Sequence, residues 1–152
     1  MLNQGLMSSN TNEWATPKTL FDELDKEFHF TLDPCSTHEN AKCEKHYTIV
    51  ENGLQQDWKN EIVFCNPPYG TEIKKWVKKC YEEHMKNNTT VVMLIPARTD
   101  TSYFHEYIYK KCDEIRFIKG RVKFVNENGE QQNSAPFPSM LVIYKKKYIR
   151  EV

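Results

Sequence analysis

The fold is decided by the stretch Ile62-Val63-Phe64-Cys65, which is followed directly by Asn66-Pro67-Pro68-Tyr69-Gly70. Its first four residues form a short, continuously apolar run, which is typical of a strand buried on both faces of a sheet. The two prolines that follow cannot donate backbone hydrogen bonds, so the strand must end there. The stretch therefore predicts a buried strand that leads into a stiff polar loop.

Helices are expected on both sides of this stretch. A Thr cap at Thr16, with Pro17 at the first helical position, starts a helix that runs to about residue 28. Apolar residues recur every three or four positions over 72–86, which predicts a second amphipathic helix. Asp100 or Thr101 caps a third, at 103–108, and a short helix is expected at 39–45.

Strands alternate with these helices. They are expected at 28–33, 62–65, 90–95, 115–118 and 140–144, with a further candidate at 121–125 that turns at 128–129. This alternation predicts an α/β domain of three layers with a mainly parallel central sheet. Such sheets bind ligands at the carboxyl ends of their strands, where Asp33 and Asn66 both fall.

Length and composition limit the class of protein. A chain of 152 residues makes about one domain, and we expect it over 13–152 with a flexible tail at 1–12. No apolar run approaches the roughly 18 residues that cross a bilayer, and the first residues lack a signal-peptide pattern. No membrane partner is therefore expected.

The five cysteines lack the close pairing typical of zinc sites, so neither a metal nor a disulfide framework is expected. Reduced thiols fit the cytoplasm. Cys65 and Cys80 fall at apolar positions and are expected in the core.

Charge is distributed unevenly, although the chain as a whole is neutral. Residues 1–69 carry five lysines against eleven Asp and Glu residues, a net charge of −6. Residues 70–152 carry sixteen Lys and Arg against ten Asp and Glu, a net charge of +6. The basic half would attract a polyanion such as nucleic acid, or it is simply a solvated lysine surface.

The loop after the buried strand offers a specific chemistry. The Asn66 side chain and the Pro67 carbonyl are both acceptors, held in place by Pro67 and Pro68, and they match the two N–H donors of an aromatic amine. Tyr69 adds a flat face on which a base would stack. The loop therefore suits an adenine amino group, aimed at an electrophile by position and fixed dipoles. The alternative is a stiff strand exit with a packed tyrosine.

Further short strings accompany this loop in a recognisable order. They are Trp14-Ala15-Thr16-Pro17, Leu32-Asp33-Pro34-Cys35, Asn40-Ala41-Lys42-Cys43, Gly53-Leu54 with Asp57-Trp58, Pro96-Ala97-Arg98-Thr99-Asp100-Thr101, Gly120-Arg121-Val122-Lys123-Phe124 and Phe137-Pro138-Ser139. With Asn-Pro-Pro-Tyr, they resemble the small phage-type DNA N6-adenine methyltransferases, which use S-adenosylmethionine. The resemblance runs from about residue 13 to 145 and implies a Rossmann-like methyltransferase domain.

The resemblance implies a role for each matching residue. Asn66, Pro67, Pro68 and Tyr69 would be catalytic, and no protein nucleophile would be needed. The cofactor S-adenosylmethionine would be held by Thr16, Pro17, Asp33, Pro34, Cys35 and Asp57. Asp57 fits equally well as a surface residue beside Trp58. The turn at 34–38 lacks the glycines usual in related enzymes, and Glu44 and Glu51 remain alternatives for the ribose.

The substrate implied by the resemblance is adenine in DNA, swung out of the duplex. DNA would be held by Arg98, Lys74, Lys75, Arg121, Lys123 and Phe124, with Lys78 and Lys79 on the same predicted helix. Phe124 fits equally well in the core of a strand. Because the chain has no room for a separate recognition domain, its selectivity is either modest or depends on a second subunit, which leaves a homodimer open.

Two other functions remain open from sequence. The same acceptor pair suits an adenine in RNA or a glutamine amide in protein, although Tyr69 and the basic half favour a nucleobase. Without the usual glycines, the chain also fits a degenerate nucleic-acid-binding module that no longer turns over.

Overall fold

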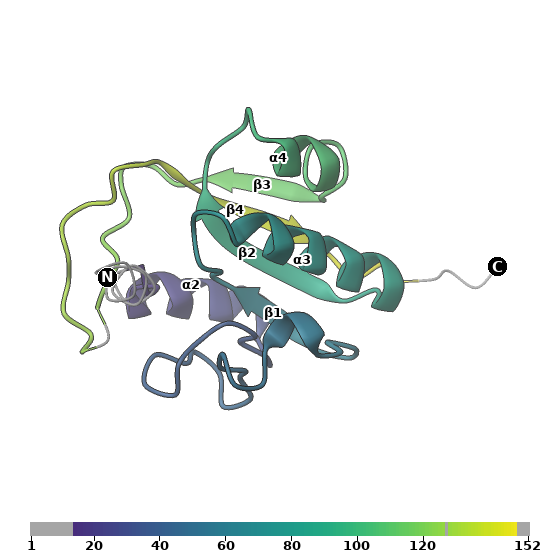
Figure 1. Cartoon of the computed structure of the whole chain (residues 1–152), viewed down its shortest axis with the longest axis horizontal. Coiled ribbons are helices and arrows are strands. Elements are labelled where there is room, and N and C mark those ends of the chain that lie inside the picture. The colour runs from purple at the N-terminus through teal and green to yellow at the C-terminus, as the bar shows by residue number, and fades with distance from the viewer. Residues whose placement is uncertain (1–13, 127, 149–152) are drawn as a thin grey trace.

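Four strands form the central sheet in the order β1-β2-β4-β3 (Figure 1). They are β1 (Ile62–Cys65), β2 (Thr90–Pro96), β3 (Glu114–Phe117) and β4 (Ser139–Tyr144), seen in a computed structural model that describes residues 14–126 and 128–148. β1 pairs with β2 in parallel, whereas β4 pairs antiparallel with both β2 and β3. The mixed α/β class is confirmed.

The prediction of a mainly parallel sheet is wrong, because two of these three ladders are antiparallel. Only β4 runs against the other strands, but it is inserted between β2 and β3 and so reverses both pairings. All six residues of β4 are buried. A strand buried on both faces has the same apolar sequence whichever way it runs, so its direction left no mark in the sequence.

The strand expected at 28–33 is reduced to single bridges. Helix α2 (Lys18–Phe28) continues to residue 28 and ends at His29, which adopts a left-handed conformation. Leu32 then bridges Val63 of β1 in parallel, and Asp33 bridges His46. The Phe64 amide donates to the Leu32 carbonyl, so this short segment still extends the sheet beside β1.

The other helices follow the sequence closely, with one exception. α3 (Ile73–Asn87) matches the expected helix at 72–86, and α4 (Ser102–Tyr107) begins after Thr101, whose side chain caps it. No helix forms at 39–45, where turns held by side chains replace it. The 3-10 turn η1 (Gly53–Gln55) was not predicted.

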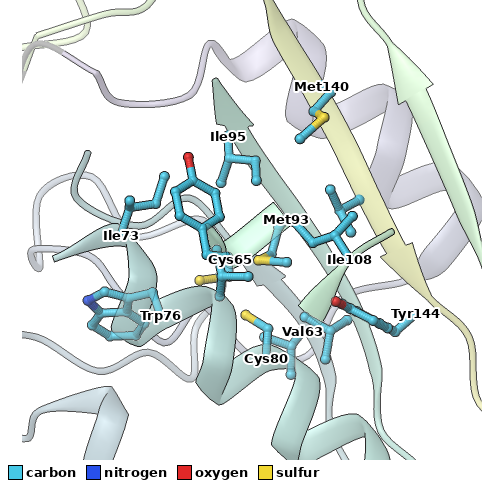
Figure 2. Close-up of a cluster of buried hydrophobic side chains, with 14 of the residues drawn as sticks. Val63, Cys65, Ile73, Trp76, Cys80, Met93, Ile95, Ile108, Met140 and Tyr144 are labelled. Atoms are coloured by element: carbon cyan, nitrogen blue, oxygen red, sulfur yellow. The ribbon is translucent and has the colours of Figure 1, made fainter. Parts of the chain in front are cut away.

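Alternating side chains divide the core between the two faces of the sheet. On one face, Cys65, Met93 and Val142 pack with α3 and α4. Figure 2 shows Cys65 and Met93 within this cluster. On the other face, Phe64 and Leu94 pack with α2 and with the long connection between β3 and β4. The three-layer arrangement is thus present, with one layer completed by an irregular segment.

The prediction that Cys65 and Cys80 lie in the core is confirmed, since both are buried. The five cysteines are free thiols. Within residues 14–126 and 128–148, no helix combines the length and apolar character that a membrane crossing requires.

One buried carboxylate ties the loop before β1 to α3. Glu83 is 1% exposed, and its oxygens accept from the Trp58 amide (3.0 Å) and the Asn87 side chain (2.8 Å). Lys79 completes the cluster with an ion pair to Glu83 (2.8 Å) and lies over the Trp58 ring. Lys79 is therefore held by Glu83 and Trp58 and is not available to bind a DNA phosphate.

Glu83→Ala is expected to lower the free energy of unfolding by about 3–5 kcal/mol, because it leaves the Lys79 charge and the Trp58 amide without their partner. Urea denaturation followed by circular dichroism measures the change. Glu82→Ala is the matched control, since Glu82 is exposed on the same helix. Equal stability of the two variants would contradict the structural role assigned to Glu83.

Candidate active site at the carboxyl edge of the sheet

The Asn-Pro-Pro-Tyr loop leaves the sheet where β1 ends, as the sequence predicted. Asn66 is half-buried, and its amide nitrogen donates to the Trp14 carbonyl (2.6 Å) and to the Thr16 hydroxyl (3.0 Å). Both partners lie just before α2, about fifty residues earlier in the chain. Trp14 and Thr16 therefore hold the side-chain amide of Asn66 in place.

Tyr69 closes the loop from the opposite side of that amide. Its hydroxyl lies 2.7 Å from the Asn66 Oδ1 atom and 3.1 Å from the Leu94 carbonyl oxygen of β2, both of which are acceptors. Burial raises the pKa of Tyr69 well above its ordinary value. The phenol is consequently neutral and donates, which places the amide oxygen of Asn66 on its side.

Four aromatic rings meet in front of the loop, from four separate segments. Trp14 lies 6.3 Å from Tyr69, 5.4 Å from Phe124 and 5.2 Å from Phe137, measured between ring centroids. Tyr69 also contacts Phe124 and Phe137, and those two contact each other. We call Trp14, Tyr69, Phe124 and Phe137 the aromatic cluster. Every pair of its rings touches, so the Tyr69 ring is covered.

Two members of this cluster were not predicted as site residues. Trp14 lies two residues before Thr16, and Phe137 stands between two prolines in the connection before β4. Both occur in strings that carry the family resemblance, and that was the available signal. Phe124 is fully buried within the cluster. It is therefore a core residue, as one of the two predictions for it stated, and it also lies at the candidate site.

The first turn of α2 offers free backbone donors beside Asn66. The helix has Pro17 as its N-cap, and its first main-chain bond runs from the Phe21 amide to the Pro17 carbonyl. The amides before Phe21 thus have no acceptor within the helix. The prediction that Thr16 caps α2 is wrong, because its hydroxyl accepts from Asn66 instead.

Asp33 lies next to β1 at the same edge and is 4% exposed. Its carboxylate accepts from the backbone amides of Cys35 (3.3 Å) and Lys42 (2.9 Å). Burial nevertheless raises the pKa of Asp33 to about 6, against the opposing effect of these two hydrogen bonds. Burial likewise raises the pKa of the adjacent Cys35 thiol far above its ordinary value, so Cys35 is no thiolate.

The turn at 34–38 has no glycine of its own, but Gly53 packs closely against its main chain at Pro34. A Cβ atom on Gly53 would lie 2.1 Å from the Pro34 carbonyl oxygen, so only glycine fits there. Trp58 donates its indole N–H to the Gly53 carbonyl (3.0 Å) and fixes this contact. Gly53 was quoted in the resemblance, but its place against Pro34 was not expected.

Asp57 lies away from these residues. Its carboxylate accepts from the Lys59 amide (2.9 Å) and from Asn87 (3.0 Å), the last residue of α3. Asn87 precedes the start of β2, which is the amino end of the sheet. The structure therefore separates Asp57 from Asn66, and Asp57 is left out of the site. Glu51 accepts from the Thr48 amide and hydroxyl in a local turn.

The remaining predicted cations gather near the aromatic cluster. Arg98 follows β2 and lies over the Phe137 ring (5.7 Å). Arg121 and Lys123 are exposed, and they alternate with the buried Val122 and Phe124 on one extended segment. That segment was predicted as a strand, but its Val125 makes only single bridges, to Ala15 and Gln131.

Two lysines of α3 reach the same edge. Lys74 and Lys75 are exposed in the first turn of the helix, which begins just after Gly70 of the loop. Lys75 pairs with Glu72 at 3.4 Å across the surface. The five cations and the one aromatic ring predicted to contact DNA thus lie at the end of the sheet that carries Asn66.

Known proteins are similar to this chain in sequence, one of them over nearly its whole length. A DNA N-6-adenine-methyltransferase of Haemophilus phage HP1 is 29% identical over 150 residues, which cover 97% of this chain and 86% of the phage protein. A second enzyme of that name, from Escherichia phage T1, is 37% identical over 95 residues, or 61% of this chain and 39% of its own length.

The model of the family DNA N-6-adenine-methyltransferase (Dam) matches residues 4–152. This match covers the Asn66 loop, the edge of the sheet that surrounds it and the aromatic cluster. The chain therefore belongs to the Dam family of DNA N6-adenine methyltransferases, as its sequence motifs indicated.

Proposed function

We propose that this chain transfers a methyl group from S-adenosylmethionine to the N6 amine of an adenine in DNA, and that the base is swung out of the duplex. The observation that carries the proposal is the Asn66 amide, held at the carboxyl edge of the sheet with both of its N–H groups already engaged. Its oxygen accepts from the Tyr69 hydroxyl and has a second lone pair with which to receive an amine.

The residues at this edge fit S-adenosylmethionine. The uncapped first turn of α2 supplies backbone N–H groups suited to a carboxylate. The Asp33 carboxylate, which is buried and ionises near pH 6, suits an ammonium group. When bound, the cofactor would supply an activated methyl group on sulfur.

Asn66 would act on the amine by accepting its hydrogens. The lone pair of an adenine amine is delocalised into the ring, so the nitrogen is a weak nucleophile. Hydrogen bonds to Asn66 Oδ1 and to the Pro67 carbonyl favour a pyramidal nitrogen and orient it. The prolines keep these acceptors fixed, so the loop need not reorganise as the N–C bond forms.

The aromatic cluster would receive the base. Stacking of a base on an aromatic ring contributes about 1–3 kcal/mol. However, the Trp14 ring now faces Tyr69 at 6.3 Å, and a base between two rings needs about 7 Å, twice the usual stacking distance. The Trp14 ring must therefore move before a base can lie on Tyr69.

Two alternatives share this site, an adenine in RNA and a glutamine amide in protein. The cations around the aromatic cluster favour a nucleic acid over a protein. A transfer assay with labelled S-adenosylmethionine and with DNA, RNA and protein in parallel decides among them, and label found only in protein would refute the proposal.

The third alternative is a binding module without turnover. Calorimetry with S-adenosylmethionine tests it, because an inert module would release no heat. Heat of binding together with methylated adenine in DNA would exclude this alternative.

Asn66→Ala is expected to lower the rate of methyl transfer to DNA by at least about 10³-fold, because it removes a fixed acceptor at the reacting nitrogen. Label transfer at saturating DNA and cofactor measures the rate. Cofactor affinity, measured by calorimetry, should stay within a few-fold of the wild-type value. Transfer at the wild-type rate would contradict the role of Asn66.

Cofactor affinity is expected to depend on pH through Asp33. Since the pKa of Asp33 is about 6, the carboxylate is mostly protonated at pH 5 and ionised at pH 7. Only the ionised form pairs with an ammonium, so affinity should be about tenfold weaker at pH 5 than at pH 7. Calorimetry at the two pH values measures this difference.

Asp33→Asn separates this effect from the pH dependence of other groups. The variant should bind the cofactor more weakly at pH 7 and show no such change between pH 5 and pH 7. A tenfold dependence that survives in Asp33→Asn would assign the titration to another group.

Replacing Arg121 and Lys123 together by Ala is expected to weaken DNA binding equally for all sequences. If each cation neutralises one phosphate, the slope of log K against log salt should fall by about 2. Fluorescence anisotropy at several salt concentrations measures it. The matched control replaces Lys59 and Lys86, two exposed lysines toward the opposite end of the sheet, and equal slopes for both pairs would contradict the assigned surface.

A further inference from the structure

The orientation of the Asn66 amide decides whether the loop can work at all. The oxygen and the NH₂ group of an asparagine side chain are nearly the same size, and a half-turn of the amide exchanges them. An amine substrate donates hydrogens, so it requires the oxygen. With the NH₂ group in that place, two donors would face each other and the substrate would be repelled.

We propose that Thr16 is a positioning residue, whose hydroxyl holds the Asn66 amide in the productive orientation together with the Trp14 carbonyl. The proposal rests on the function proposed for Asn66. It gives Thr16 a task different from the cofactor contact that the family resemblance implies.

The main chain of Trp14 selects the orientation. A backbone carbonyl only accepts, and it lies 2.6 Å from the Asn66 nitrogen. After a half-turn of the amide, two oxygens would face each other at that distance, without a hydrogen between them. The carbonyl is itself held in place, because the next residue, Ala15, accepts from the Val125 amide (3.0 Å).

The hydroxyl of Thr16 then fixes the plane of the amide. The Asn66 nitrogen carries two hydrogens, and Thr16 Oγ1 at 3.0 Å is the acceptor for the second one. A hydroxyl alone would suit either orientation, since it both donates and accepts. Combined with the carbonyl, it leaves the NH₂ group no freedom to twist, and Asn66 Oδ1 stays on the side of Tyr69.

The burial of Thr16 argues against a direct cofactor contact through its hydroxyl. The residue is 2% exposed, and its oxygen already accepts from Asn66. An anion at the start of α2 would instead meet the main-chain amides of the first turn, which a side-chain substitution leaves in place. Loss of the hydroxyl should therefore change turnover and spare cofactor binding.

Thr16→Val tests this prediction, because valine keeps the shape of threonine and removes the acceptor. At saturating DNA and cofactor, kcat for methyl transfer is expected to fall about 10- to 100-fold, the scale set by a misplaced reacting group. The dissociation constant for S-adenosylmethionine, measured by calorimetry, should change less than about threefold. Thr16→Ser is the conservative control and should restore kcat.

Nuclear magnetic resonance gives a readout that general destabilisation would not reproduce. In a ¹⁵N-labelled sample, the side-chain NH₂ signals of Asn66 are assigned by their loss in Asn66→Ala. In Thr16→Val these signals should shift and their hydrogens should exchange faster with water, whereas in Thr16→Ser they should stay near the wild-type positions. Thermal melting of each variant shows that the fold is retained.

Three results would overturn the proposal. The first is an unchanged kcat in folded Thr16→Val, when the separate Asn66→Ala variant is inactive. This result would refute the role of Thr16 but not that of Asn66. The second is weaker cofactor binding with normal kcat, which would assign the hydroxyl to the cofactor. The third is an Asn66 NH₂ signal that Thr16→Val does not move. Full activity of Asn66→Ala would instead refute the proposed function itself.

Discussion

The amide of Asn66 adds polar contacts to two parts of the chain that also pack through aromatic rings, Trp14 on Tyr69 and Phe21 on Phe64. Its nitrogen binds Trp14 and Thr16, and its oxygen binds Tyr69, so one side chain connects the entry to α2 with the exit from β1. A half-buried amide that lost these partners would keep unsatisfied polar groups near the core. Apolar packing holds α2 on the sheet, and this contact fixes the residues just before its uncapped first turn. Asn66 therefore has a structural role at the carboxyl edge in addition to its proposed contact with the substrate.

Elements set by local patterns were predicted well. The spacing of Trp76, Val77 and Cys80 located α3, and the apolar run of β2 located the strand beside β1. The predictions failed where a distant partner decides. The direction of β4 depends on the strands beside it, and the segment at 28–33 became bridges because α2 continues to Phe28 before the chain turns at His29. Periodicity contains no information about either outcome.

The candidate site shows the same division. The sequence identified the loop at 66–69 because two prolines after a buried strand are rare and have a direct physical meaning. It left Asp57 open as a cofactor contact or as a surface residue beside Trp58, and the hydrogen bond to Asn87 at the opposite end of the sheet favours the second. Trp14 and Phe137 escaped because their place is set by contacts among four separate segments. The sequence shows which residues are neighbours along the chain, but not that the rings of distant residues pack together.

Under the proposed function, the segment at 121–125 would join two tasks, contact with DNA and placement of a ring of the aromatic cluster. Its exposed side chains, Arg121 and Lys123, are cations. The buried Phe124, which follows them, belongs to the aromatic cluster. Under the proposed function, phosphates held on the outer face would act on the same backbone that places Phe124 against Trp14. Contact with the DNA backbone and the placement of Phe124 would then come from neighbouring residues of one segment, because exposed and buried side chains alternate along it.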